Sequence, residues 1–305
     1  MQTNISGKSM PQSPVTSIFQ QIDSFPALPA TVNRVMEIVA NPESTAHELM
    51  QAILPDQAMC LAILKLANSA FFGRPREVCS IEEAIVVLGF QEIRTIILTQ
   101  AVFNSFQKLR NINKQEIDAL WDHSLTCALA AKIIATHTNG YSPSQLFIAG
   151  LIHDMGKIAM LMALPHNYSL LGRDFSERLR LSFFPEEEEK FGISHNEVGM
   201  RLLNRWLFPE QLCAATGYHH RSDTVPGDAA FPLIVQMADM LSHVVHAQEG
   251  INGQEFLGLI SDFSPESIKL WGHYNFNWQQ QDIDTWLTEL RTNLEDGTLL
   301  NVFSN

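Results

Sequence analysis

Apolar residues recur every three or four positions through most of the chain, which is the spacing of helices that bury one face. In the first half this spacing predicts helices at residues 18–22, 32–39, 45–53, 59–67, 80–88 and 93–106. The breaks between them coincide with residues that stop helices, such as Asn41-Pro42 and Gly89. No segment alternates as a half-buried strand does, so we predict an all-α fold.

The second half continues the helical pattern. One long helix is expected over Glu116–His137, and residues 144–164 are apolar nearly all round, as expected of a central buried helix. Ser194 and Glu197 form a capping box, which predicts a helix with His195 in its first turn. Further helices are expected at residues 210–220, 231–246, 256–260, 267–271 and 283–294.

These elements divide the chain into four parts. Residues 1–16, polar and dotted with prolines, form a predicted disordered tail. Residues 17–110 form an N-terminal helical lobe, residues 111–250 a second lobe with the candidate metal ligands, and residues 251–305 a C-terminal helical extension. The chain has 305 residues, of which 46% are apolar, and this is enough to bury a large core.

Composition and charge exclude several classes of protein. No run of about 18 uncharged apolar residues occurs and the N-terminus lacks a signal-peptide pattern, so we expect a cytoplasmic protein without membrane attachment. The net charge of −13 argues against a nucleic-acid polymer as partner, because such binding needs a basic surface. The four cysteines show no CxxC pairing and are expected as buried, reduced thiols, although Cys127 lies one turn after His123 and could approach a metal.

Ionisable residues interrupt the most apolar predicted helix. His153, Asp154 and Lys157 lie within five positions of one another in that helix, and Asp239 is surrounded by apolar residues in another. Burying an unpaired charge is costly, so these groups need partners or an opening to solvent. A bound divalent cation would compensate for both carboxylates.

Imidazoles and carboxylates follow one another along the second lobe in an order that favours a metal centre. The set consists of His123, His153, Asp154, His195, His219, His220 and Asp239. Such ligands bind divalent iron, manganese, zinc or nickel.

Each member also has an ordinary structural interpretation. His123 could be a hydrogen-bonded core or surface residue, the pair His219-His220 could end a helix, and Asp239 could pair with an arginine. We interpret the acidic run Glu186–Glu189 as a solvated face. The other histidines are expected to be structural: His47, His137, His166, His243, His246 and His273.

Residues 151–157, LIHDMGK, resemble the central helix of the HD superfamily of metal-dependent phosphohydrolases, which is named for the His153-Asp154 dipeptide. Three further motifs resemble the HDOD branch, whose name means HD-related output domain. They are ANSA at residues 67–70, AIVVLG at 84–89, and HNEVG at 195–199 with Trp206 and Pro209.

The resemblance implies a multi-helix HD-superfamily bundle with two metal ions bridged by Asp154. The first ion would take His123, His153, Asp154 and Asp239; the second would share Asp154 and add His195, His219 and His220. The implied chemistry is metal-assisted hydrolysis of a nucleotide-like phosphoester. Asp154 and Lys157 would be catalytic, and Lys157 with Arg221 would contact the substrate phosphate.

Other features of the sequence weigh against catalysis. The related HD-GYP cyclic-di-GMP phosphodiesterases carry a GYP signature soon after the paired histidines, whereas this chain reads HHRSDTVPG at residues 219–227. HDOD proteins resemble signalling outputs, many without catalytic residues. The alternative is therefore a non-catalytic regulatory module with a structural or sensing metal pocket, whose partner is a phosphorylated small molecule or a signalling protein. A helical scaffold without metal is the third alternative.

Overall fold

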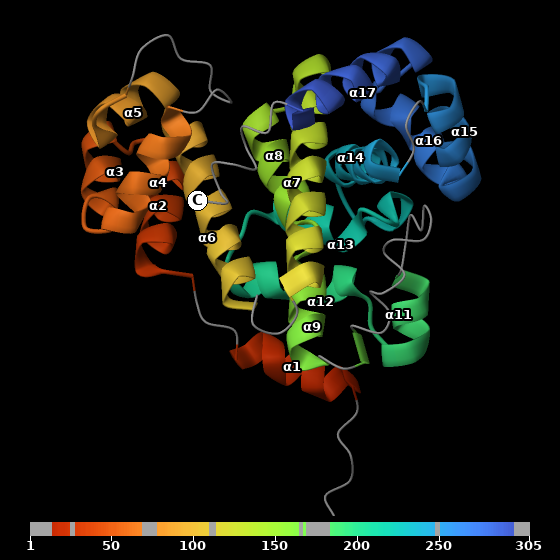
Figure 1. Ribbon diagram of the computed structural model, residues 1–305, viewed down its shortest axis with the longest axis horizontal. Helices are drawn as coiled ribbons and strands as arrows, with labels where there is room; N and C mark the ends of the chain where they lie inside the picture. The colour runs from red at the N-terminus through yellow and green to blue at the C-terminus, as the bar shows by residue number, and fades with distance from the viewer. Residues whose placement is uncertain are drawn as a thin grey trace, which may run out of the picture.

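The regular structure of this chain is helical. The computed structural model describes residues 14–24, 28–68, 78–109, 114–164, 167–168, 184–247 and 251–295 (Figure 1), and within them every regular element is an α-helix or a short 3-10 helix. The predicted all-α fold is confirmed. Most of the predicted disordered tail, residues 1–13, lies outside the described residues.

Four helices pack together as the N-terminal lobe: α2 (Ala30–Ala40), α3 (Ala46–Ile53), α4 (Gln57–Ala67) and α5 (Ile81–Leu88). Thr45 begins α3 with a capping box, in which its side chain accepts from the backbone of Glu48 and the Glu48 side chain accepts in return. Gly89 ends α5 with a φ of 82°, a conformation that favours glycine. The long helix α6 (Phe90–Leu109) then runs from this lobe to α8.

Helix α1 (Pro14–Ser24) packs on the second lobe, whereas the sequence predicts it within the N-terminal lobe. It begins at Pro14, before the expected start of the fold, and it packs against α9 and α12 rather than against the N-terminal lobe (Figure 1). Ile18 and Ile22, fully buried at the same face, explain this position, because the lobe of α9 and α12 supplies the apolar surface that covers them.

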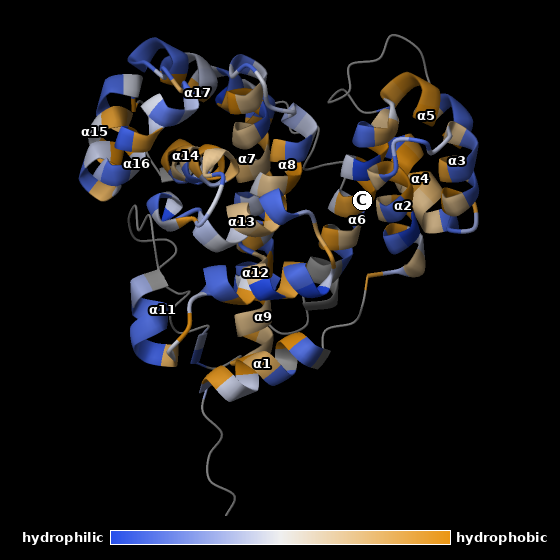
Figure 2. Ribbon diagram, turned by 180° about the vertical axis from the view of Figure 1, so that it is seen from behind, coloured by the Kyte–Doolittle hydropathy of each residue, from blue (hydrophilic) through white to orange (hydrophobic). Residues whose placement is uncertain are grey.

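The second lobe is built around α7 (Lys114–His137), α8 (Pro143–Ile152) and α14 (Ala230–Ala247). Figure 2 shows that α8 and α14 are strongly apolar, in contrast to hydrophilic α11 (Phe184–Phe191). Around this centre lie α9 (Met155–Ala163), α12 (His195–Arg205) and α13 (Glu210–Tyr218). By length and composition, the stretch Pro143–Ala163 could cross a membrane, but 89% of that window is buried inside the protein, as in the core of a helical bundle.

The predicted single helix over residues 144–164 is wrong. The chain leaves the helix at His153 and Asp154, and Asp154, with φ −99° and ψ 13°, precedes the first residue of α9. The apolar pattern continues across the break because both α8 and α9 are buried on nearly all sides, so the periodicity contains no signal of a helix end. The break places the two candidate ligands at a junction between helices.

Close helix crossings fix the relative positions of these elements. A Cβ atom on Gly156 of α9 would lie 1.8 Å from the carbonyl oxygen of His195 and 2.7 Å from the backbone nitrogen of Gly199, both on α12. Only glycine permits this approach. The crossing brings the first residue of α12 beside the break between α8 and α9.

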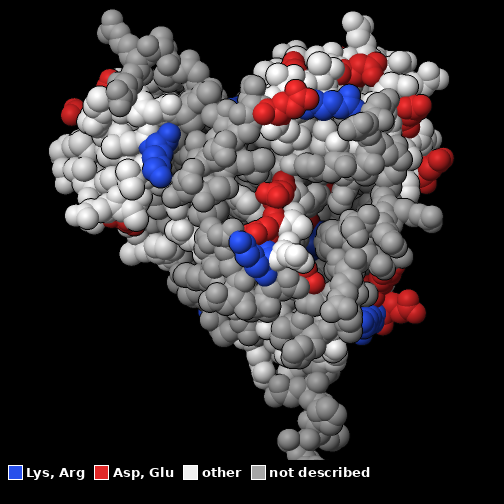
Figure 3. Space-filling model, viewed as in Figure 1, with Lys and Arg blue, Asp and Glu red and all other residues white. Residues whose placement is uncertain are grey.

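The C-terminal extension covers one side of the second lobe. It consists of α15 (Gly253–Phe263), α16 (Pro265–Trp271), and α17 (Gln280–Glu295), with the 3-10 turn η4 (Gly272–Tyr274) between the last two, and α17 packs on α7 and α14 (Figure 1). Ser267 of α16 is hydrogen-bonded at 2.8 Å to Ser222, in the 3-10 turn η3 (Ser222–Thr224) that follows the paired histidines. Over the face in Figure 3, acidic side chains are spread across the described surface and no basic patch is seen there.

Candidate metal centre

The structure brings all seven predicted ligands together. His123 lies within α7, and His153 and Asp154 lie at the break between α8 and α9. His195 begins α12, His219 and His220 follow α13, and Asp239 lies within α14. Five of the seven therefore lie at helix ends or at a break, and only His123 and Asp239 lie within a helix.

The two oxygens of the Asp154 carboxylate face different groups of histidines. Its Oδ2 lies 3.3 Å from Nε2 of His123 and 3.3 Å from Nε2 of His153. Its Oδ1 lies 3.3 Å from Nε2 of His195 and 3.8 Å from Nε2 of His219. Asp154 thus lies between two sets of imidazoles, as the predicted bridging role requires.

Asp239 lies on the other side of the first set. Its Oδ1 is 3.2 Å from Nε2 of His123 and 3.6 Å from Nε2 of His153, and its Oδ2 is 3.9 Å from Nδ1 of His220. Ligands about 2.1 Å from one ion lie roughly 3 to 3.5 Å apart. Several of these separations already fall in that range.

Three groups of potential ligand atoms lie close enough to share an ion, with all atoms in each group within 4.8 Å of one another. The groups are His123, His153 and Asp239; His195, His219 and His220; and His153, Asp154 and His219. The first two correspond to the two predicted ligand sets without Asp154, and the third joins them.

Hydrogen bonds to backbone carbonyl oxygens orient two of the histidines. Nδ1 of His153 lies 2.7 Å from the carbonyl oxygen of Gly150, and Nδ1 of His219 lies 3.0 Å from that of Thr216. A carbonyl oxygen only accepts, so the proton is on Nδ1 in both rings. Nε2 therefore presents a lone pair toward the carboxylates when the ring is neutral, which is the form that binds metal.

The donor set fits divalent cations. Asp154 Oδ1, Asp239 Oδ1, His195 Nε2 and His219 Nε2 are buried and have no hydrogen-bond partner. Burial and the positive charge of nearby His153 lower the pKa of His219 to about 3, so this imidazole is neutral at pH 7. Carboxylate oxygens and imidazole lone pairs facing one another without a proton repel, and a cation between them removes that repulsion.

Charged neighbours strengthen the attraction for cations. Burial opposes ionisation of Asp154, yet the positive charges of His153 and Lys157 hold its pKa well below the usual range. Burial likewise opposes protonation of His153, but the Asp154 carboxylate raises the pKa of His153 well above its ordinary value. The carboxylates therefore favour positive charge in the centre, and in the absence of metal a proton on His153 supplies part of it.

Lys157 and Arg221, the predicted phosphate contacts, are both held by carboxylates. Nζ of buried Lys157 lies 2.6 Å from Oδ2 of Asp154. Arg221 lies at the surface, with its Nη2 atom 2.6 Å from Oε2 of Glu188, and it lines a cavity of about 290 Å³ together with His220. A role in binding phosphate stays a prediction for both.

The predicted solvated face Glu186–Glu189 is wrong at one position, Glu187. Glu186 and Glu189 are exposed, but Glu187 is 1% exposed, and its Oε2 accepts hydrogen bonds of 2.7 Å from Nδ1 and from the backbone nitrogen of His195. Its Oε1 accepts from the hydroxyl of Tyr168 at 2.6 Å. A carboxylate behind a ligating histidine orients the ring and raises its basicity.

The same contact replaces the predicted capping box at the start of α12. Ser194 makes no capping hydrogen bond, and Glu187 accepts from the first backbone nitrogen of the helix instead. A signal for Glu187 exists in the sequence, because residues 184 and 191, three before it and four after it, are both phenylalanine. That spacing places Glu187 on the apolar face of α11.

His243 also joins the centre, although it was expected to be structural. Its Nε2 lies 3.3 Å from Oδ1 of Asp239, one turn earlier on α14, and its ring lies 4.5 Å from that of His123. The i, i+4 spacing from Asp239 was the available signal.

The cysteines take no part in the groups of ligand atoms above. Cys127 and Cys213 are buried and Cys60 is partly buried, as expected, but Cys79 is exposed. Burial raises the pKa of the Cys127 thiol, so the side chain remains protonated in the core of α7.

Comparison with known proteins identifies the kind of domain that carries this centre. The pattern of the HDOD domain matches residues 25–222. An uncharacterized protein of Treponema pallidum (strain Nichols) is 26% identical over 223 residues, which is 73% of this chain and 42% of that protein. The chain thus spans less than half the length of the curated relative that it matches.

Solved structures share the fold. The crystal structure of an HDOD domain protein with unknown function from Geobacter sulfurreducens superposes with a TM-score of 0.66 and 24% identity, over 95% of this chain and 96% of that one. A protein of Shewanella amazonensis SB2B, whose name proposes a phosphohydrolase, gives a TM-score of 0.64 and 19% identity, over 89% and 98% of the two chains. At these identities the likeness shows the arrangement of helices alone.

Proposed function

The chain belongs to the HDOD domain family, and we propose that it is a signalling protein whose buried centre binds two divalent metal ions and hydrolyses a phosphoester. One observation carries this proposal: buried acceptor atoms of Asp154, Asp239, His195 and His219 converge without hydrogen-bond partners. Their convergence is hard to explain without a cation, because each atom would lose its hydration without gaining a hydrogen bond.

The geometry supports an assignment of residues to the two ions. His123, His153 and Asp239 would hold the first, His195, His219 and His220 the second, and Asp154 would contact both through its separate oxygens. His243, 3.3 Å from Asp239, is a further candidate for the first set. The mixed nitrogen and oxygen donors favour iron, manganese, nickel or zinc.

When bound, two divalent ions would supply Lewis acidity for attack on phosphorus. The chain itself prepares the centre for them. Glu187 holds His195 with Nε2 inward, and Gly150 and Thr216 do the same for His153 and His219 through their carbonyl oxygens. Arg221, in the cavity that His220 also lines, would attract an anionic substrate to the side of the second ligand set.

The test combines metal analysis with turnover. The purified protein is analysed for metal by mass spectrometry and assayed with p-nitrophenyl phosphate and bis(p-nitrophenyl) phosphate. We expect about two divalent ions per chain and hydrolysis of at least one ester. Asp154→Asn should lose both, whereas Asp262→Asn, which changes an exposed carboxylate on α15, should keep both. A metal-loaded protein without turnover over a wider panel of phosphoesters would refute the hydrolase.

A regulatory role is the second candidate, and the burial of the centre favours it. His153, His195 and His219 are each 0% exposed and Asp154 is 1% exposed, so a substrate has little access to the shared carboxylate. In this case the metals stabilise the domain or report on a ligand. Metal retained without turnover, together with a partner interaction that chelation abolishes, is the result expected of this role.

A further inference from the structure

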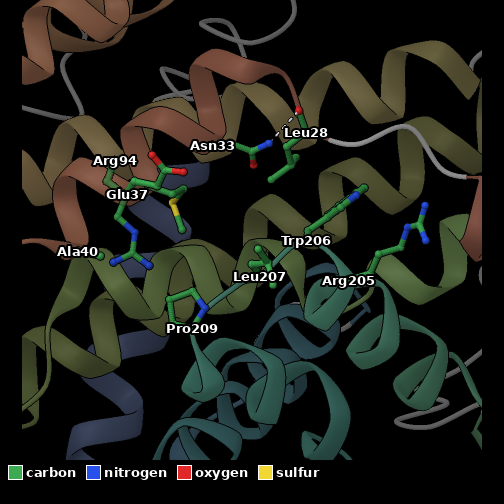
Figure 4. Close-up of a pocket in the computed structure, with 10 residues that line it drawn as sticks. Leu28, Asn33, Glu37, Ala40, Arg94, Arg205, Trp206, Leu207 and Pro209 are labelled. Atoms are coloured by element: carbon green, nitrogen blue, oxygen red, sulfur yellow. Dashed lines mark hydrogen bonds between the residues drawn. The ribbon is translucent and has the colours of Figure 1, made fainter.

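A second cavity lies between the two lobes, away from the metal centre. Its volume is about 520 Å³, within the range of small-molecule sites in proteins. Met36 and Ala40 of α2 and Arg94 of α6 form one wall, and Trp206, Leu207 and Pro209, in the turn between α12 and α13, form the other (Figure 4). None of the proposed metal ligands lines it.

Arg94 carries an unbalanced charge into this cavity. Its Nε is buried without a hydrogen-bond partner, and among the described residues no carboxylate pairs with its guanidinium. Burial lowers the pKa of Arg94, which reflects the partial loss of hydration. The other charged residues at the cavity are engaged, since Glu37 pairs with Arg34 at 3.0 Å and Arg205 donates to the carbonyl oxygen of Asp23 at 2.8 Å.

The opposite wall is apolar and includes an unusual exposed leucine. Leu207, two residues after the end of α12, is 87% exposed and has a φ of 58°. Glycine is the usual residue there, and leucine is disfavoured because its Cβ comes close to the following carbonyl oxygen in this conformation. The side chain gains no core contact in exchange. Figure 4 places Leu207 and Pro209 between Arg94 on one side of the cavity and Trp206 on the other.

We propose that this cavity binds a small organic anion, in which a carboxylate, sulfonate or phosphate is attached to an apolar body. Arg94 pairs with the anionic group through its planar fork of N–H donors. Trp206 and Leu207 contact the apolar body. Because the two walls come from different lobes, the ligand holds the lobes together. Binding at this cavity requires neither the metal ions nor hydrolysis.

Two fluorescent probes with the same rings test the proposal. 8-Anilinonaphthalene-1-sulfonate carries the anion, and N-phenyl-1-naphthylamine lacks it. We expect Arg94→Gln to lower the affinity for the sulfonate about tenfold, since a charge-assisted hydrogen bond contributes about 1.4 kcal/mol or more. The affinity for the neutral probe should fall less than twofold. Ala40→Trp, which fills the cavity from an exposed position on α2, should lower the affinity for both probes. Lys269→Gln, which changes an exposed cation on α16 that does not line the cavity, should change neither.

Each outcome of these experiments supports or overturns the proposed anion site. Unchanged affinity for the sulfonate in Arg94→Gln, with the helical circular dichroism intact, overturns the proposal, and so does retention of both probes by Ala40→Trp, because the dye then binds elsewhere. If Arg94→Gln fails to fold, Ala40→Trp decides alone. Displacement of the sulfonate by decanoate indicates an alkyl carboxylate ligand and displacement by phenyl phosphate an aryl phosphate. Displacement by neither overturns the proposal.

Discussion

The metal centre and the cavity between the lobes both hold charge away from water, but they compensate for it differently. In the centre, the carboxylate of Asp154 lies 2.6 Å from the ammonium of Lys157, and that of Asp239 lies 3.2 to 3.9 Å from imidazole nitrogens of His123 and His220. In the cavity, the guanidinium of Arg94 faces apolar side chains and has no carboxylate partner among the described residues.

This difference has a physical consequence. Removing one member of a compensated buried set leaves the others unpaired and destabilises the fold. Removing a single unpaired charge relieves a cost instead. Similar substitutions should therefore have opposite effects on stability in the two places, and this contrast can be measured directly.

Lys157→Met should produce the largest effect. It leaves the buried carboxylate of Asp154 without its ammonium partner 2.6 Å away. We expect the free energy of unfolding to fall by about 4 kcal/mol in urea denaturation with a chelator present. An unchanged free energy of unfolding would mean that the imidazoles alone compensate for Asp154.

Gly156→Ala should have the second largest effect and lower the free energy of unfolding by about 3 kcal/mol. The new methyl group would overlap backbone atoms of α12 that cannot rotate away. The helix crossing that positions His195 should open as well. Gly258→Ala, on α15 with no atom within 4 Å of the new Cβ, is the matched control and should be neutral or stabilising. Equal losses in both variants would show that glycine is not required at the crossing.

Glu187→Gln tests the carboxylate behind His195. Gln keeps the shape but weakens the hydrogen bond to Nδ1, and we expect the affinity for metal, measured by competition with a chelator, to fall about 10- to 100-fold. Glu189→Gln changes an exposed carboxylate of the same helix and should have no effect. Equal affinities for metal in the two variants would mean that Glu187 only caps α12 and does not support metal binding.

Arg94→Met should change the free energy of unfolding least, and it should increase it rather than lower it. The half-buried guanidinium without a partner is replaced by an apolar chain of similar length. We expect the ligand-free protein to gain about 1 kcal/mol in the free energy of unfolding. Arg34→Met, at an exposed ion pair, should change it by less than about 0.5 kcal/mol. Destabilisation by Arg94→Met would indicate a partner for the guanidinium.

The helices and the principal ligands could be predicted because each follows from local information. Apolar periodicity predicts the position of amphipathic helices such as α7 and α12, and charged residues such as Asp154 and Asp239 stand out against an apolar background. Both signals are weaker where a helix is apolar on every side, which is why the break at His153 and Asp154 was missed.

Contacts between distant elements could not be predicted in this way. Glu187 and His195 meet because α11 folds back on α12, and an acidic run alone suggests a solvated surface. The cavity beside Arg94 depends on how α2 and α6 lie against the turn after α12, which no local pattern describes. The placement of α1 against α9 and α12 is a further case, since its apolar face fits either lobe by composition.

Anomalous diffraction from crystals of the protein, recorded at the absorption edge of the bound metal, tests the central claim most directly. We expect two peaks, one within bonding distance of His123, His153 and Asp239 and one within bonding distance of His195, His219 and His220, with Asp154 in contact with both. No peak in crystals grown with excess metal, or peaks bounded by other residues, would contradict it.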